Sequence, residues 1–190
     1  MTREKTALLI VDMQEDIVAA RESTRKSVPV LRQVLDAFRK KGLPVFHIIR
    51  TYRRDWSDVE LPRVSEFTEK GPRVIENTPG ARIVTPLAPR GGEYVVVKKR
   101  WSGFFMTELP LLITRLGIDG SVICGTQTPN CVRATAFDAI SYDLDTTVLS
   151  DGTSAATPEI HEANLLDMKN IGIKILTCDE IIAEVGKLKR

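Results

Sequence analysis

The chain has 190 residues, of which 43% are hydrophobic and 27% are charged, and its formal net charge is +2. This is ordinary for a globular protein, and we expect one domain over residues 1–190 with a sizeable core. The interspersed charges give no basis for recruiting nucleic acid or an acidic membrane, and no apolar run approaches the roughly 20 residues that cross a bilayer.

The cysteines indicate a reducing compartment. There are three, Cys124, Cys131 and Cys178, and they form no clustered spacing. An odd, unclustered set argues against a disulfide framework. The N-terminus lacks the basic start and cleavage pattern of a signal peptide, so we expect a cytoplasmic protein.

Short apolar runs alternate with segments of helical periodicity along the chain. Strands are predicted at 7–11, 44–49, 94–97, 121–124, 146–149 and 172–176, and helices at 28–41, 108–116, 129–140, 158–168 and after a capping box at 177–180. The irregular stretch 51–90 is predicted to be loops with a short helix that can cover a site. This order predicts an α/β protein, a three-layer α-β-α, Rossmann-like open sheet of about six mostly parallel strands with helices on both faces.

Three reactive side chains follow predicted strands. Asp12 follows the first, Lys98 the third, and Cys131 lies one turn beyond the fourth. Because reacting groups in such sheets lie beyond the carboxyl ends of the strands, the three are expected in one crevice. Each also has a plainer interpretation: Asp12 as a helix cap, Lys98 as a surface residue, and Cys131 as a small buried hydrophobe.

The segment before Cys131 predicts a tight turn into a helix. Thr128 is expected to cap this helix and Pro129 to occupy its first position. Cys131 then lies in the first turn, where free backbone N–H groups and the helix dipole favour a thiolate.

Three motifs in order resemble those of the isochorismatase-like cysteine hydrolases. They are Leu9-Ile-Val-Asp12-Met-Gln14, then Val97-Lys98-Lys-Arg-Trp-Ser-Gly-Phe104, and finally Gly125-Thr-Gln-Thr-Pro-Asn-Cys131-Val. The third matches a turn of the form Gly-x-x-Thr-x-x-Cys-Val. The combination is specific, and the chain is identified as a member of this family.

The resemblance implies a catalytic triad of Asp12, Lys98 and Cys131. It also implies a cis peptide between Thr126 and Gln127, and an oxyanion hole formed by the backbone N–H groups of Gln127 and Cys131. The implied reaction is hydrolysis of a C–N bond in a small amide, ureide or carbamoyl compound through a cysteine thioester, with no metal and no cofactor. The expected partner is a small-molecule substrate, in a homodimer or homotetramer.

The branch of the family is narrowed by the region after the second predicted strand. Nicotinamidases carry an Asp-x-His metal motif there, whereas this chain has Asp55 with no histidine two residues on. Both histidines, His47 and His161, are expected to be structural. The sequence Gln-Thr-Pro-Asn before Cys131 resembles the carbamoyl and ureido amidases slightly more than it resembles the nicotinamidases.

Aromatic and arginine side chains are the candidates for the walls of the substrate pocket. The family often has Asp-Phe after Met-Gln, where this chain has Glu15-Asp16-Ile17. The candidates to shape the pocket instead are Trp56, Trp101, Phe104 and Arg53. Among Arg50, Arg53 and Arg54, any of which can bind a substrate carboxylate, a solvated or interface role is expected for at least two.

Two other functions remain open at this stage. One is hydrolysis of a vinyl ether of the isochorismate type, with Cys131 as a bystander. The other is non-catalytic binding of a small molecule on the same fold. A dehydrogenase is disfavoured, because no Gly-x-Gly-x-x-Gly follows the first strand.

Overall fold

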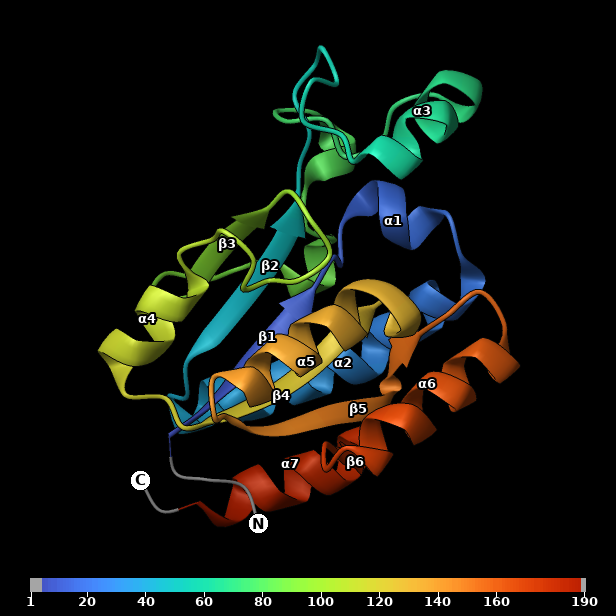
Figure 1. Cartoon of the computed structure of the whole chain (residues 1–190). Coiled ribbons are helices and arrows are strands. Elements are labelled where there is room, and N and C mark those ends of the chain that lie inside the picture. The colour runs from blue at the N-terminus through green and yellow to red at the C-terminus, as the bar shows by residue number, and fades with distance from the viewer. Residues whose placement is uncertain (1–4, 189–190) are drawn as a thin grey trace.

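The structure, a computed structural model, describes residues 5–188 and contains one parallel sheet (Figure 1). The strand order is β3-β2-β1-β4-β5-β6, and every neighbouring pair is parallel. The strands are β1 (Thr6–Val11), β2 (Val45–Arg50), β3 (Tyr94–Lys98), β4 (Gly120–Thr126), β5 (Asp145–Ser154) and β6 (Lys174–Leu176). The predicted α/β class is therefore confirmed, and the chain order reverses between β1 and β4.

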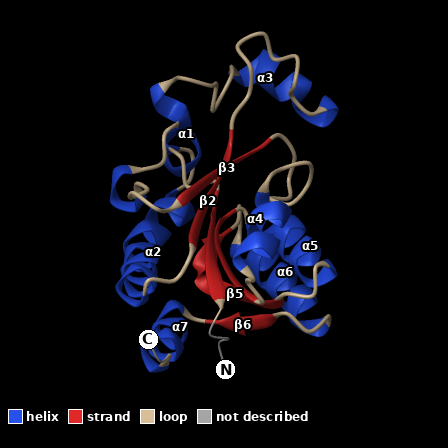
Figure 2. Ribbon diagram, turned by 90° about the vertical axis from the view of Figure 1, so that its left-hand side faces the viewer, coloured by secondary structure: helices blue, strands red, loops and turns tan. Residues whose placement is uncertain are grey.

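Helices cover both faces of the sheet, as Figure 2 shows. One layer holds α1 (Glu15–Ala19), α2 (Glu22–Lys41) and α7 (Cys178–Lys187), and the other holds α4 (Leu109–Leu116), α5 (Arg133–Ser141) and α6 (Pro158–Asn170). The remaining helix, α3 (Val64–Lys70), stands beyond the arrowheads of β1 and β2 in Figure 1. It lies above the edge where reactive groups are expected.

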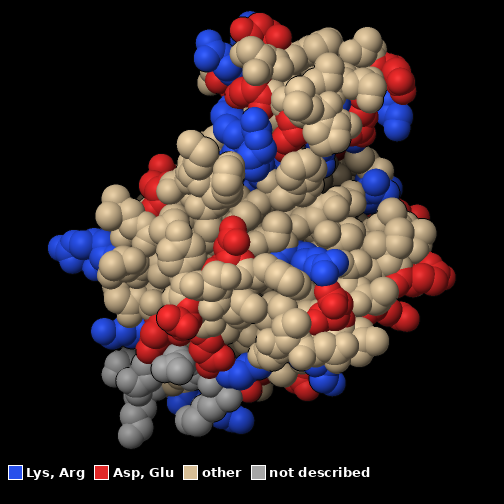
Figure 3. Space-filling view, in the orientation of Figure 1, with Lys and Arg blue, Asp and Glu red and all other residues tan. Residues whose placement is uncertain are grey.

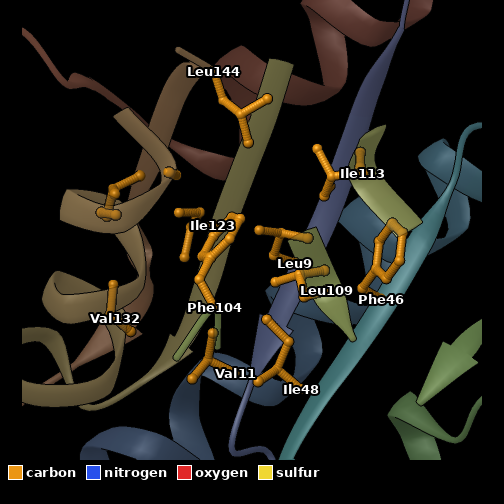
Figure 4. Close-up of a cluster of buried hydrophobic side chains, with 14 of the residues drawn as sticks. Leu9, Val11, Phe46, Ile48, Phe104, Leu109, Ile113, Ile123, Val132 and Leu144 are labelled. Atoms are coloured by element: carbon orange, nitrogen blue, oxygen red, sulfur yellow. The ribbon is translucent and has the colours of Figure 1, made fainter. Parts of the chain in front are cut away.

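The central strands are buried on both faces, which explains their unbroken apolar runs. All six residues of β1 and all seven of β4 are buried. One core lies between the sheet and α4, α5 and α6, and Figure 4 shows part of it around Leu9, Ile48 and Ile123. A second core lies beneath α2 and α7. Each buried aliphatic side chain contributes about 1.5–3 kcal/mol, so the sheet is a rigid base for the site.

Several predicted helix boundaries are confirmed by their caps. The Thr157 hydroxyl accepts a hydrogen bond from the first turn of α6, and Thr177 and Glu180 form the complete capping box of α7. Gly42 and Gly117 end α2 and α4 in the left-handed conformation.

Two elements are longer than predicted, for a shared reason. Helix α2 begins at Glu22 rather than at residue 28, and β5 continues to Ser154 instead of stopping at residue 149. The extra residues are polar, so hydrophobic periodicity cannot reveal them. Some of them are nevertheless buried, and the Thr24 hydroxyl lies 2.9 Å from that of Ser154, which lies 3.0 Å from that of Thr126. Hydroxyl pairs thus fasten the ends of α2, β4 and β5 to one another.

The segment predicted as loops with a short helix has that form. It contains α3 and three short 3-10 turns at Leu61–Arg63, Pro79–Ala81 and Thr85–Leu87. A small core of its own, centred on Tyr52 and Phe67, packs the segment together. Helix α1 joins it to the body, because the Asp16 carboxylate accepts a hydrogen bond from the Val74 N–H at 2.7 Å.

The surface charges agree with the composition. On the face drawn in Figure 3, acidic and basic side chains are interspersed in small groups. Within residues 5–188, no helix has both the length and the apolar character needed to cross a membrane. All three cysteines are free thiols, and all three are buried.

Candidate active site

Asp12 and Lys98 form a buried ion pair at the carboxyl edge of the sheet. Asp12 directly follows β1 with φ of +53°, a conformation that aspartate tolerates better than most residues. Lys98 is the last residue of β3, and its Nζ donates to Asp12 Oδ2 at 2.8 Å. The Lys98 side chain is 0% exposed and the Asp12 side chain is 3% exposed. Strand β2 lies between β1 and β3, so the long lysine side chain reaches across the end of β2.

A buried glutamine fixes the end of β2. The Gln14 side chain accepts from the Arg50 N–H and donates to the Arg50 carbonyl, both at 2.8 Å. The same amide nitrogen donates to the Ala81 carbonyl. Gln14 therefore acts as a substitute strand partner beyond the end of β1, and it holds the irregular segment against the sheet.

The turn that carries Cys131 starts with a close backbone approach. Gly125 has φ of +106°, and a Cβ there would lie 2.1 Å from the Val11 carbonyl oxygen, so only glycine fits. The Thr126–Gln127 peptide bond that follows is cis. Cys131, 4% exposed, then lies in a π-helical turn over Thr128–Val132 that leads into α5.

The predicted cap at Thr128 is wrong. The N-cap of this turn is Gln127, with no side-chain cap. The Thr128 hydroxyl instead bonds to His161 Nδ1 at 2.8 Å, and the other ring nitrogen lies 2.9 Å from the Ser150 carbonyl oxygen. A tertiary partner on α6 has thus replaced the local cap, and His161 ties the turn to α6 and β5.

The environment of the Cys131 thiol differs from the sequence-based expectation. Burial raises its pKa, and the negative charge of Asp12 adds to this, whereas Lys98 and Arg50 lower it. The loss of hydration outweighs what a helix N-terminus supplies. The resting group is therefore a thiol that needs a base, and Asp12 Oδ1, which is buried and has no hydrogen-bond partner among residues 5–188, is available as one.

Arg50, which the sequence named only as one of three arginines that can bind a substrate carboxylate, contacts Cys131. Its Nη2 donates to Cys131 Sγ at 3.3 Å. Its Nη1 pairs with Glu60 and donates to the Tyr52 hydroxyl at 2.6 Å. As expected for two of the three arginines, Arg53 and Arg54 are exposed. The available signal was the position of Arg50 as the last residue of a strand, at the edge shared with Asp12 and Lys98.

A cavity of about 400 Å³ opens onto Asp12 and Cys131. Its walls come from the ends of the strands, from α1 and its flanks, from the Cys131 turn and from the segment around α3. The lining residues are Asp12, Ile17, Ala20, Arg21, Arg50, Tyr52, Arg63, Glu66, Phe67, Lys70, Arg73, Val74, Thr126, Gln127, Asn130 and Cys131. The irregular segment therefore covers this site, as the sequence suggested.

The predicted pocket residues lie elsewhere. Phe104 is in the core, where it stacks on Tyr142, and Figure 4 shows it beside Ile123. Trp56 packs edge-on against Phe67, and Arg53 is 63% exposed in its side chain. None of these residues lines the cavity, because Phe104 packs into the core and the other two lie on the outer side of the irregular segment.

Trp101 is placed behind the wall rather than on it. Its ring lies 5.8 Å from the Arg50 guanidinium carbon and 5.9 Å from that of Arg63. It therefore supports two arginines that do line the cavity. The aromatic wall itself comes from Tyr52 and Phe67.

The histidines have structural partners. His47 Nε2 lies 2.9 Å from Glu93 Oε2, and burial lowers the pKa of His47. His161 holds the Cys131 turn as described. Across residues 5–188, no group of three or more His, Cys, Asp and Glu side chains is arranged to hold a metal ion.

The fold and this edge define the class: a three-layer α/β protein with its candidate site where the chain order reverses, between β1 and β4. The chain belongs to the isochorismatase family, whose domain model matches residues 6–180. The membership predicted from the three motifs is confirmed.

Known relatives extend over nearly the whole chain. A protein of Arabidopsis thaliana named probable inactive nicotinamidase is 43% identical over 189 residues, 95% of this chain and 96% of that protein. The crystal structure of an isochorismatase family protein from Desulfovibrio vulgaris superposes with a TM-score of 0.91 at 39% identity, covering 97% of this chain and 100% of that one. The N-carbamoylsarcosine amidase of an Arthrobacter species is 28% identical over 165 residues, 85% of this chain and 62% of the amidase.

Proposed function

We propose that the protein hydrolyses a C–N bond of a small amide, ureide or carbamoyl compound, with Cys131 as the nucleophile. The observation that carries this proposal is the buried Lys98–Asp12 ion pair beside a cavity that both Asp12 and Cys131 line. A relative named as an N-carbamoylsarcosine amidase supports the substrate class. The relative named as probably inactive makes a direct test necessary.

The reaction needs one proton carrier and one nucleophile. Asp12 takes the thiol proton, the Cys131 sulfur attacks the carbonyl carbon, and the resulting tetrahedral intermediate expels the amine, which takes the proton from Asp12. The product at this point is a thioester. Water then attacks the thioester carbonyl after giving a proton to Asp12, the C–S bond breaks, and the sulfur recovers that proton. Lys98, which pairs with Asp12, holds the carboxylate in place for both proton transfers.

The negative charge that develops on the carbonyl oxygen needs donors. We assign this role to the backbone N–H groups of Gln127 and Cys131, since both residues line the cavity at the turn. Removing one such donor commonly costs about 3 kcal/mol of transition-state stabilisation. The Gln127 side chain is held in turn: with its oxygen facing Arg21, it accepts from the Arg21 Nε at 2.5 Å.

The charges on the cavity wall favour a substrate that also bears a carboxylate. Arg73 pairs with Glu66 across the wall. Arg21, Arg63 and Lys70 line the cavity as well, and within residues 5–188 none of the three forms an ion pair with a carboxylate. This surplus of positive charge offers charge-assisted hydrogen bonds to an anionic group.

The test combines turnover with trapping of the intermediate. We expect ammonia or amine release from a panel of amides, ureides and carbamoyl compounds, and an acyl adduct on Cys131 in acid-quenched samples analysed by mass spectrometry. Cys131→Ala should abolish both, while Cys178→Ala, at a buried thiol in α7 away from the cavity, should keep both.

Two outcomes would replace the proposal. Turnover of isochorismate that survives Cys131→Ala would indicate vinyl ether hydrolysis. Absence of turnover for both classes, together with saturable binding of panel compounds, would indicate a non-catalytic binder.

A further inference from the structure

The Arg50 guanidinium is buried and forms a hydrogen bond with the sulfur of Cys131. Arg50 is 1% exposed, and its Nη2 donates both to Cys131 Sγ at 3.3 Å and to the Arg100 carbonyl at 3.1 Å. The same carbonyl accepts from Lys98 Nζ at 3.3 Å. Arg50 ends β2, so it lies between the strands that carry Asp12 and Lys98.

The position of this guanidinium is held from behind by two buried side chains. Glu60, 2% exposed, forms an ion pair with Arg50 Nη1. The Tyr52 hydroxyl accepts from Nη1 at 2.6 Å and donates to Glu60 Oε2 at 2.5 Å. Because Gln14 fixes the backbone of Arg50 as well, both ends of this long side chain are restrained. Because the Arg50 side chain is already held in place, it loses little further conformational entropy when it donates to the sulfur.

The charges around the sulfur balance in a way that suits proton transfer. Asp12 and Glu60 are paired with Lys98 and Arg50, so the buried cluster is neutral while Cys131 is a thiol. Transfer of the thiol proton to Asp12 keeps the total charge at zero and moves the negative charge from the side of Lys98 to the sulfur. An unpaired thiolate there would be strongly disfavoured by the loss of hydration. Arg50 is already in position to donate to it.

We propose that Arg50 is a further catalytic residue, whose guanidinium stabilises the Cys131 thiolate when Asp12 takes the thiol proton. Glu60 and Tyr52 are positioning residues for Arg50. This inference rests on the proposed function in taking Cys131 as the nucleophile. The charged side chains facing the sulfur are Asp12 from the end of β1, Lys98 from β3 and Arg50 from β2, and of these the two cations favour the thiolate.

The test measures thiolate formation without any substrate. Alkylation of Cys131 by iodoacetamide is followed by peptide mass spectrometry from pH 6 to pH 11.5, because burial already raises the pKa of this thiol, and the midpoint of the rate profile gives that pKa. For Arg50→Gln we expect the midpoint to rise by about one pH unit or more, which is about a tenfold loss of thiolate at neutral pH. Arg50→Lys should recover part of the shift, because it restores the charge without the fork of donors.

Further variants keep the test sharp. Arg50→Gln leaves Glu60 without its cation, so the double variant Arg50→Gln/Glu60→Gln provides a neutral pair if the single variant does not fold. Tyr52→Phe should shift the midpoint in the same direction by less, because it loosens the hold on Arg50 without changing any charge. The matched control is Arg133→Gln, which removes an arginine two residues from Cys131 that pairs with Asp167 outside the cavity, and it should leave the midpoint unchanged.

The inference and the proposed function fail separately. A folded Arg50→Gln/Glu60→Gln protein with the wild-type midpoint would overturn the role of Arg50, even if amide hydrolysis by the wild type is found. A raised midpoint supports the role of Arg50 even if the substrate panel gives no turnover. Wild-type kcat in the double variant on a substrate that the native protein turns over would also overturn the inference.

Discussion

Replacing Lys98 by methionine should destabilise the protein in a way that depends on pH. Lys98→Met keeps an unbranched apolar side chain of nearly the same length and removes the charge that pairs with Asp12. The two side chains are 0% and 3% exposed, so the small values typical of surface ion pairs do not apply. Loss of one partner from a buried pair costs about 3–5 kcal/mol. Asp12 Oδ1 already lacks a partner among the described residues, so the whole carboxylate would be left unpaired.

The loss in the free energy of unfolding has an upper limit, because the unpaired carboxylate can take up a proton and become neutral. Protonating an ordinary aspartate costs about 4 kcal/mol at pH 7 and about 1.5 kcal/mol at pH 5. The folded variant would hold this proton and the unfolded chain would release it, so the deficit grows as pH rises above about 4. We expect a loss of about 4 kcal/mol at pH 7, or about 10 °C in Tm for a chain of this size, and a clearly smaller loss at pH 5.

Urea unfolding at both pH values is the assay, with two comparison variants. The double variant Asp12→Asn/Lys98→Met should regain most of the lost stability, since asparagine keeps the shape of aspartate and tolerates positive φ. Lys174→Met, which removes a lysine from a half-exposed pair with Asp145, should cost under about 1 kcal/mol. A Lys98→Met deficit that is equal at pH 5 and pH 7, or that stays in the double variant, would refute the reasoning.

Three other predictions test the turn, the far end of the sheet and the cavity wall. Gly125→Ala should reduce stability by at least about 3 kcal/mol in thermal unfolding, because its Cβ would lie 2.1 Å from the Val11 carbonyl oxygen at φ of +106°; a near-native Tm would contradict the close approach. Interactions with Arg39, the Arg90 N–H and the neighbouring histidine lower the pKa of Glu93 from 4.5 to about 2, despite its partial burial. This stabilisation is complete above pH 4.5 and is lost as pH falls toward 2, so Glu93→Gln should remove about 3 kcal/mol at pH 7 and flatten acid unfolding across that window; an unchanged acid profile would argue against it. Arg63→Gln should raise KM about tenfold with little change in kcat for a carboxylate-bearing amide, and leave a neutral amide unaffected; equal effects on both would exclude Arg63 as an anion contact.

Patterns of apolar residues carry the layout of the sheet. The unbroken run at residues 7–11 predicted a strand buried on both faces, and β1 is fully buried between β2 and β4. The predicted bounds were too short where an element is buried through hydroxyl groups. The first turn of α2 and the end of β5 have no apolar period that would reveal them. Their hydroxyl groups, such as those of Thr24 and Ser154, become partners only once the chain has folded.

The candidate site divides along the same line. Asp12 and Lys98 were predictable because strand order places both at one edge, and their ion pair is present. The pocket wall was not predictable. Ile17 and Phe67 line the cavity together with Cys131, whereas Phe104, which lies within the second motif, packs into the core.

By itself, the sequence determined the class of fold, the edge of the sheet that carries the reactive groups, and the family. These follow from local periodicity, from turn chemistry and from short motifs, all of which are written in neighbouring residues. Only the tertiary structure decided that Arg50 touches the Cys131 sulfur, that Glu60 and Tyr52 hold it there, and that the segment around α3 closes the cavity. Those contacts join residues far apart in the chain, and burial and charge pairing act on them only once the sheet has brought the strands together.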